Sequence, residues 1–167
     1  MDSDDILFNN VVLCICEDSN GNIWLGTFFN GAIRYSRKTN RFDKRLVKGV
    51  APYGLLSSQI NNIMEDSEGK LWFSTNGGGI NIYDPESETF EYILRDESKD
   101  DPNQLIDNYC TIACEDHTGV FWIGTFRGLC AYDKTLNRFT YYSLQNGNLP
   151  NNIVFYLKAD SKGKIWV

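Results

Sequence analysis

The sequence of 167 residues is poor in several features that define common classes of protein. It has no cluster of lysine and arginine longer than a pair, and its net charge is −6, so neither nucleic-acid binding nor contact with an anionic membrane surface is expected. The longest apolar run, Val11 to Cys16, is far too short to cross a bilayer. The acidic N-terminus MDSDDILFNN lacks an apolar core, so no secretory signal is expected. A signal or a membrane anchor would have to belong to a longer parent chain.

Groups for catalysis or metal binding are equally scarce. The only histidine, His117, falls in an expected surface turn, without a pocket or a partner for general-base chemistry. The five cysteines include no C-x-x-C pair, and Cys16 and Cys114 share a repeat position where another copy has methionine, which indicates core hydrophobes rather than zinc ligands. The segment DSNG at Asp18 is weakly similar to a calcium loop but has Phe29 where such a loop needs glutamate. We expect no cofactor, no metal and no enzymatic activity.

Aromatic residues, by contrast, are abundant at 14%, which favours strands. One aromatic-containing phrase is repeated along the chain. It reads EDSNGNIWLGT from Glu17, EDSEGKLWFST from Glu65, EDHTGVFWIGT from Glu115 and, in shortened form, ADSKGKIWV from Ala159. The tryptophans of the four copies are spaced by 48, 50 and 44 residues and are Trp24, Trp72, Trp122 and Trp166.

Each repeat predicts four short antiparallel strands. An apolar segment leads into a tight E-D-x-x-G turn, in which the aspartate caps the backbone amides and the glycine supplies a positive φ. The tryptophan strand follows, then a glycine turn, a segment ending in tyrosine, a polar turn and a last strand with phenylalanine. Four strands per 44–50 residues is the period of a β-propeller blade. We expect each tryptophan to fill the space between neighbouring sheets.

The predicted fold is therefore all-β, an open β-propeller of about three and a half four-stranded blades. The expected blades are 9–57, 58–107 and 108–150, followed by the first strands of a truncated blade at 151–167. The first strands are expected to begin at Val12, Ile60, Cys110 and Val154.

The motif E-D-x-x-G-x-L/I-W-I/L-G-T, followed by glycines, Y-D and F, resembles the two-component regulator propeller repeat. The resemblance covers the chain from about Asn9 to Val167. It implies a seven-bladed parent in the periplasmic sensor region of a hybrid two-component sensor kinase. It also implies that the parent detects an oligosaccharide and regulates polysaccharide utilisation.

The chain has fewer blades than the four to eight of a closed propeller, so we expect it to be a fragment of a longer one. An open arc would expose inter-blade hydrophobes and unpaired strand edges at both ends. We therefore expect self-association through the open blade edges.

If the E-D-x-x-G turns lie at one end of the blades, the loops between second and third strands share the opposite end with the crossovers between blades. These loops vary in chemistry, which suits recognition. Aromatic rings stack on sugar faces, whereas amide and guanidinium groups bind hydroxyls or acidic sugars. The candidate ligand-binding residues are Phe28, Phe29, Asn30, Tyr53, Asn76, Phe126 and Arg127.

Structural alternatives stand beside these assignments. Phe28 and Phe126 share a repeat position and could pack against the next blade, Asn76 could belong to an ordinary turn, and Arg127 could be a solvated charge. The polar residues that precede the first strands are expected to cap loops; they are Asn10, Ser58, Asn108 and Asn152.

Three functions follow from this reading. The first is a sensor propeller that binds carbohydrate, and the second is a protein-interaction or dimerisation platform without a small ligand. The third is an enzyme similar to the propeller lyases that inactivate antibiotics, which the single histidine disfavours because such a lyase needs a metal-assisted His/Glu site.

Overall fold

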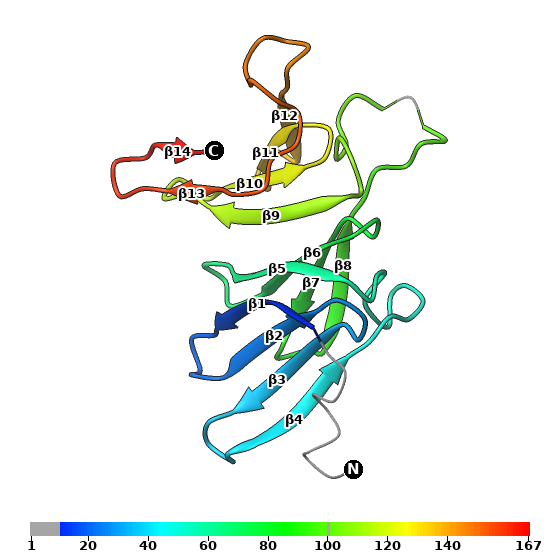
Figure 1. The fold of residues 1–167 in the computed structure, drawn as a ribbon, viewed down its shortest axis with the longest axis vertical. Coiled ribbons are helices and arrows are strands. Elements are labelled where there is room, and N and C mark those ends of the chain that lie inside the picture. Colours follow the sequence, from blue (N-terminus) through cyan, green and yellow to red (C-terminus); the bar gives the residue numbers. More distant parts are fainter. Residues whose placement is uncertain (1–10, 100) are drawn as a thin grey trace.

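The computed structural model describes residues 11–99 and 101–167, and all of the regular elements in this part of the chain are strands (Figure 1). The first sheet contains β1 (Val12–Glu17), β2 (Ile23–Thr27), β3 (Ala32–Ser36) and β4 (Arg41–Leu46). The second contains β5 (Ile60–Glu65), β6 (Leu71–Thr75), β7 (Ile80–Asp84) and β8 (Thr89–Ile93). The third contains β9 (Cys110–Glu115), β10 (Val120–Thr125), β11 (Leu129–Asp133) and β12 (Arg138–Tyr142). A final hairpin pairs β13 (Lys158–Ala159) with β14 (Ile165–Trp166).

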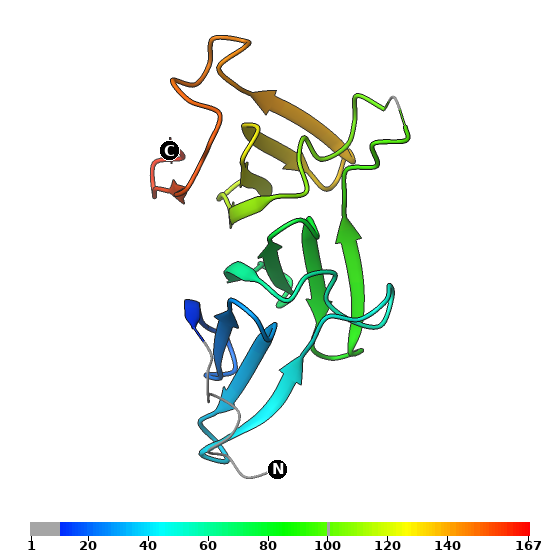
Figure 2. The ribbon, with the colours of Figure 1, turned by 45° about the vertical axis from the view of Figure 1, so that its right-hand side comes forward.

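Each four-stranded sheet is an antiparallel meander in which neighbours in sequence are neighbours in space. The sheets follow one another along the long axis of the molecule, with their first strands on one side and their last strands on the other (Figure 2). β5 lies between β1 and β9. The predicted all-β arc of propeller sheets is confirmed.

Three contacts join the successive units. The first junction is the contact between the first and second sheets, and the second junction is the contact between the second and third sheets. The third junction is the contact between the third sheet and the hairpin β13–β14.

The start of the fourth unit differs from the prediction. A strand was expected from Val154, but in the structure the ladder begins at Lys158, because only Ile165 and Trp166 pair with this segment. Val154 itself is buried against the third sheet, and its carbonyl accepts a hydrogen bond from the Thr111 hydroxyl. The beginning of the expected first blade at residue 9, together with Asn10, lies outside the described residues.

The core is divided between the junctions. Trp24 and Trp72 are both 0% exposed. Trp24 meets Phe73 of the next sheet edge-on, with ring centroids 6.1 Å apart, and Trp72 stacks on Phe121 at 4.0 Å with the planes 6° apart. The expectation that these tryptophans fill the space between sheets is confirmed for the first and second junctions.

The repeated aspartate connects the turn to this core. In the second sheet one oxygen of Asp66 accepts hydrogen bonds from the backbone N–H groups of Glu68 (3.0 Å) and Lys70 (2.8 Å), as the turn prediction requires. The other oxygen accepts the Trp72 indole N–H at 2.8 Å. The same bond from indole to carboxylate recurs in the other three units, at 2.8–2.9 Å. The carboxylate therefore fixes both the turn and the orientation of the inter-sheet indole.

The repeated glutamate connects one sheet to the next. Glu65 accepts hydrogen bonds from the backbone N–H (2.7 Å) and the hydroxyl (2.8 Å) of Ser19 in the preceding turn. Glu115 accepts the same two bonds from Ser67, both at 2.7 Å. We call this arrangement the serine–glutamate clamp. It explains why two acids recur side by side: the aspartate acts within its own turn and the glutamate acts across the junction.

The third junction has no such clamp, because His117 replaces the serine and Ala159 replaces the glutamate. The imidazole of His117 instead lies against Gly163 of the following turn, where an added Cβ would come within 2.5 Å of the ring. His117 therefore has a packing role in the structure.

Candidate functional site

The loops between second and third strands lie at the same end of the sheets as the crossovers. The Phe28 N–H donates to the Val11 carbonyl at 2.9 Å, the Asn76 N–H to the Gln59 carbonyl at 3.2 Å, and the Phe126 N–H to the Tyr109 carbonyl at 3.2 Å. The accepting carbonyls all come from residues that immediately precede a first strand. The structure therefore gathers the variable loops on one surface, which we call the loop face.

Expected loop caps act on this face. The Asn108 side chain accepts the Arg95 N–H at 2.7 Å and donates to the Arg95 carbonyl at 2.9 Å, and Asn152 accepts the Leu144 N–H at 2.7 Å. Ser58 contributes its backbone carbonyl, which accepts the Gly31 N–H at 2.8 Å. These hydrogen bonds hold the crossovers and the loop at Gly31 in place.

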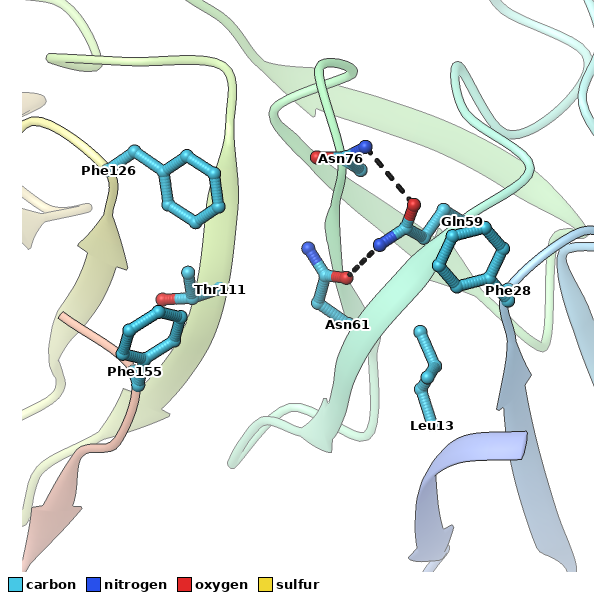
Figure 3. A pocket seen from close by; sticks show the side chains of 8 residues that line it. All are labelled: Leu13, Phe28, Gln59, Asn61, Asn76, Thr111, Phe126 and Phe155. Atoms are coloured by element: carbon cyan, nitrogen blue, oxygen red, sulfur yellow. Dashed lines mark hydrogen bonds between the residues drawn. The ribbon is translucent and has the colours of Figure 1, made fainter. Parts of the chain in front are cut away.

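A groove of about 370 Å³ opens beside the first strands (Figure 3). Figure 3 shows Phe126 and Phe155 on one side, Phe28 and Leu13 on the other, and a row of amide groups between them. None of the lining side chains carries a charge; they are Leu13, Phe28, Gln59, Asn61, Asn76, Thr111, Phe126 and Phe155.

The amide groups form a directed chain of hydrogen bonds. The Asn76 Nδ2 donates to Gln59 Oε1 at 3.1 Å, and the Gln59 Nε2 donates to Asn61 Oδ1 at 3.0 Å. Asn61 Nδ2 then donates to the Cys110 carbonyl of the next sheet at 2.7 Å. Because each primary amide has two N–H donors and two lone pairs on its oxygen, these bonds use only part of its capacity. The chain thus orients polar groups in the groove.

The aromatic side of the groove spans two repeats. Phe126 stacks on Tyr109 with centroids 6.0 Å apart and planes 12° apart, and it meets Phe155 edge-on at 6.3 Å. Phe126 is 43% exposed, and Tyr109 and Phe155 are exposed as well. Phe155 belongs to the segment that follows the third sheet, so Phe126 does contact the next unit, as the structural alternative expected. The Phe126 ring also lines the groove.

The structure brings three of the predicted ligand-binding residues together at the groove, namely Phe28, Asn76 and Phe126. Phe29 packs edge-on against Phe28 at 4.5 Å but does not line the groove.

The other predicted residues lie elsewhere on the surface. The Asn30 oxygen accepts a hydrogen bond from the Arg45 guanidinium at 2.6 Å. Tyr53 is 88% exposed in the crossover to the second sheet, and Arg127 faces Glu97 at 4.0 Å with both side chains exposed.

Sequence reasoning missed five lining residues: Leu13, Gln59, Asn61, Thr111 and Phe155. A signal existed for part of this set. Leu13, Asn61 and Thr111 occupy one repeat position, second in the first strand, and two of the three are polar. A polar residue at that point indicates a strand side chain that faces the groove and not the core.

Among residues 11–99 and 101–167, no group of His, Cys, Asp and Glu side chains has the arrangement of a metal site. The cysteines of this part of the chain are all free. Burial raises the pKa of the Cys14 and Cys130 thiols to about 12, which suppresses the reactive thiolate. These cysteines behave as core hydrophobes.

Comparison with known proteins agrees with this architecture. Residues 6–29 and 54–77 match the family described as two component regulator propeller. The solved extracellular domain of the BT3049 hybrid two-component system of B. thetaiotaomicron matches with a TM-score of 0.79 and 24% identity, over 94% of this chain and 22% of that one. The extracellular domain of the BT4673 one-component system of the same bacterium matches with a TM-score of 0.73 and 23% identity, over 99% and 21%. PorZ, a surface component of the type-IX secretion system of Porphyromonas gingivalis, matches with a TM-score of 0.52 and 12% identity, over 87% and 29%.

The sheets and their indole-filled junctions define an arc of β-propeller blades. Two stretches of the chain, one in each of its first two repeats, match the two-component regulator propeller repeat. It spans about a fifth of the length of the two B. thetaiotaomicron domains. No curated protein matches the sequence. The described part of the chain has no helix that is long and apolar enough to span a bilayer.

Proposed function

We propose that the chain belongs to the extracytoplasmic, periplasmic sensor region of a hybrid two-component system histidine kinase. In this proposal it recognises an oligosaccharide at the loop-face groove, and its parent regulates polysaccharide utilisation. The chain itself is not an enzyme; kinase activity would reside elsewhere in the parent. The family match and the likeness to extracellular domains of two-component systems support the sensor assignment.

The observation that carries the ligand assignment is the pairing of exposed phenylalanine rings with an ordered row of amides in one groove. Aromatic rings pack against the C–H face of a pyranose, and amides donate to and accept from its hydroxyl groups. The groove volume of about 370 Å³ lies within the range of small-molecule sites.

The lack of charge along the groove narrows the ligand class. A carboxylate or sulfate on a sugar would be desolvated there without a cationic partner, which is unfavourable. Arg127, which could pair with an acidic sugar, does not line the groove and faces Glu97. The proposed ligand is therefore a neutral oligosaccharide.

Calorimetric titration of the purified chain with matched neutral and acidic oligosaccharides tests the proposal. We expect heat of binding from neutral sugars only. Phe126→Ala should weaken binding about two- to tenfold, since a lost aromatic contact contributes about 0.5–1.5 kcal/mol. Gln59→Ala should weaken it comparably by breaking the amide row.

Two controls use residues outside the groove. Tyr53→Ala and Arg127→Ala should leave the affinity unchanged, because neither side chain lines it. Binding of acidic sugars that depends on Arg127 would contradict the assignment, as would binding of neutral sugars that is insensitive to Phe126 and Gln59.

One observation favours the alternative of a protein-interaction platform. The crossover between the first two sheets exposes Val47, Val50 and Tyr53 close together in sequence. Exposed apolar clusters of this kind often contact other proteins. If no sugar binds and Val50→Asp abolishes capture of a protein partner by the parent, the platform function is the better account.

A further inference from the structure

The amide groups of the groove can point in only one direction along their row. The Asn61 Nδ2 lies 2.7 Å from the backbone carbonyl oxygen of Cys110. A carbonyl oxygen has no hydrogen to donate, so the Asn61 atom that faces it must be the nitrogen. The Asn61 oxygen is then left to accept from Gln59, and the Gln59 oxygen to accept from Asn76. The Cys110 carbonyl therefore fixes the orientation of all three amides.

A second backbone carbonyl fixes the Thr111 hydroxyl. The Thr111 Oγ1 donates its hydrogen to the carbonyl of Val154, which can only accept. Toward a ligand the Thr111 hydroxyl is therefore an acceptor. The two carbonyls together assign the hydrogens of the polar side chains that line the groove, which are Gln59, Asn61, Asn76 and Thr111.

The donors and acceptors that these bonds leave unused define the pattern that a ligand meets. In the described part of the chain no group donates to Asn76 Oδ1, and Gln59 and Asn61 each keep one N–H without an acceptor. Figure 3 shows the Asn76 oxygen and the Asn61 nitrogen on the side of the row that faces Phe126. A ligand beside Phe126 therefore finds an acceptor at Asn76 and donors at Asn61 and Gln59.

We propose that Asn61 is a positioning residue of this groove: anchored on the Cys110 carbonyl, it sets the direction of the amide row and thereby selects the ligand. The ligand is a neutral sugar with a free hydroxyl that donates to Asn76 and a second oxygen that accepts from Asn61 or Gln59. A sugar without the donating hydroxyl leaves the Asn76 oxygen unpaired and is rejected. The inference rests on the proposed function, because it concerns the same site.

The neighbouring residue Asn62 provides a matched control. Asn61 and Asn62 both lie in β5 and both bond the backbone of β9, but in opposite senses. The Asn62 Oδ1 accepts the Ala113 N–H at 3.2 Å, whereas Asn61 donates to Cys110. Asn62 is half-buried, as Asn61 is, and does not line the groove. Aspartate has the shape of asparagine, but its ionised carboxylate can only accept. Aspartate can therefore keep the bond at position 62 and must lose the bond at position 61.

The experiment compares Asn61→Asp with Asn62→Asp by calorimetric titration with cellotriose, maltotriose and mannotriose. For a sugar that binds the wild-type chain, Asn61→Asp should weaken binding about tenfold at neutral pH, because the carboxylate no longer donates to the Cys110 carbonyl. Asn62→Asp should leave the affinity unchanged. Circular dichroism checks that both variants are folded.

Lowering the pH should rescue Asn61→Asp, which a purely structural role would not explain. The groove has no charged lining, and burial keeps the Cys110 thiol neutral by raising its pKa, so the pKa of the introduced carboxyl should rise. Below that pKa the protonated carboxyl can again donate to the Cys110 carbonyl. Binding by Asn61→Asp should therefore recover as the pH falls from 7 to about 5. The wild-type chain and Asn62→Asp should show no such recovery.

Failure of this inference can be told apart from failure of the proposed function. If a neutral sugar binds but Asn61→Asp and Asn62→Asp weaken binding alike, the positioning role of Asn61 is overturned and the proposed function stands. The same conclusion follows if low pH does not restore binding to Asn61→Asp. If no neutral sugar binds the wild-type chain, the proposed function fails and this inference fails with it.

Discussion

The first two junctions and the third junction use the same repeat positions, but they differ in what lies beyond the indole. In the first two, a complete sheet covers Trp24 or Trp72, and a serine–glutamate clamp joins neighbouring turns. In the third, the covering element is a hairpin of two-residue strands, Trp122 is only half-buried, and the clamp residues are replaced by His117 and Ala159. The repeat therefore specifies the hydrogen bond to the indole in every unit, whereas burial of the indole depends on the following sheet.

The largest expected difference concerns the tryptophans. Trp72→Ala should lower the free energy of unfolding by about 3–5 kcal/mol, because it opens a cavity in a fully buried site. Trp122→Ala should lower it less, and Trp166→Ala should leave it almost unchanged in a dilute monomer. Urea denaturation measures all three; equal losses would show that the junctions do not differ in the way described.

The aspartate that holds the indole provides a second test. Asp66→Ala leaves the Trp72 indole N–H and two turn amides without an acceptor in a buried setting, so we expect a loss of about 1–3 kcal/mol. Asp160 makes the same bonds in the exposed fourth unit, where water can replace the carboxylate. Asp160→Ala should therefore lower the free energy of unfolding clearly less than Asp66→Ala does. Thermal unfolding of the two variants checks the order, and a larger loss for Asp160→Ala would contradict it.

Sequence reasoning recovered the sheets, the turn capping and the inter-sheet tryptophans, because each depends on residues within one repeat or on its period. Capping by Asp18 and the positive φ of Gly21 are local properties of a short turn. The clamp was not recovered, since the side chains that meet, Ser19 and Glu65, belong to different repeats and are 46 residues apart.

The groove was recovered only in part, for a related reason. Phe28, Asn76 and Phe126 lie in loops that differ from one repeat to the next, so the sequence alone marks them as candidates. Gln59, Asn61 and Thr111 lie at or beside the first strands, and their convergence depends on how neighbouring sheets are placed side by side. The surroundings of Arg127 could not be predicted, because the sequence does not reveal that Glu97, in a crossover, lies opposite it.

The clamp itself supplies a smaller test of the comparison. Glu115→Ala removes both bonds to Ser67 and makes the second junction resemble the third. The clamp is exposed and joins neutral donors to a carboxylate, so we expect a loss of about 0.5–1.5 kcal/mol in free energy of unfolding. Glu17→Ala is the matched control, because Glu17 lies in the first sheet and has no clamp partner in the described chain. It should lower the free energy of unfolding less than Glu115→Ala does. A double-mutant cycle between Ser67→Ala and Glu115→Ala that showed no coupling would exclude a stabilising clamp.

Thiol labelling should distinguish the junctions without altering stability. Burial raises the pKa of Cys130 to about 12 and that of Cys110 well above its ordinary value, and both lie in the second junction. Cys114, in the third junction, is half-buried, and burial raises its pKa as well. We expect a water-soluble disulfide reagent at mildly alkaline pH to modify Cys114 before Cys110 and Cys130, as followed by mass spectrometry of peptides. Faster labelling of Cys130 would contradict the assignment.

The most direct test of the account is hydrogen exchange of the four indole N–H groups, observed as separate signals by NMR. Each donates to an aspartate, at distances of 2.8–2.9 Å, so differences in protection report on the covering sheet and not on the hydrogen bond. We predict strong protection for Trp24 and Trp72, intermediate protection for Trp122 and the least for Trp166. Equal protection of all four, or the strongest protection at Trp166 in a monomer, would contradict the claim that the following sheet determines how deeply each indole is buried.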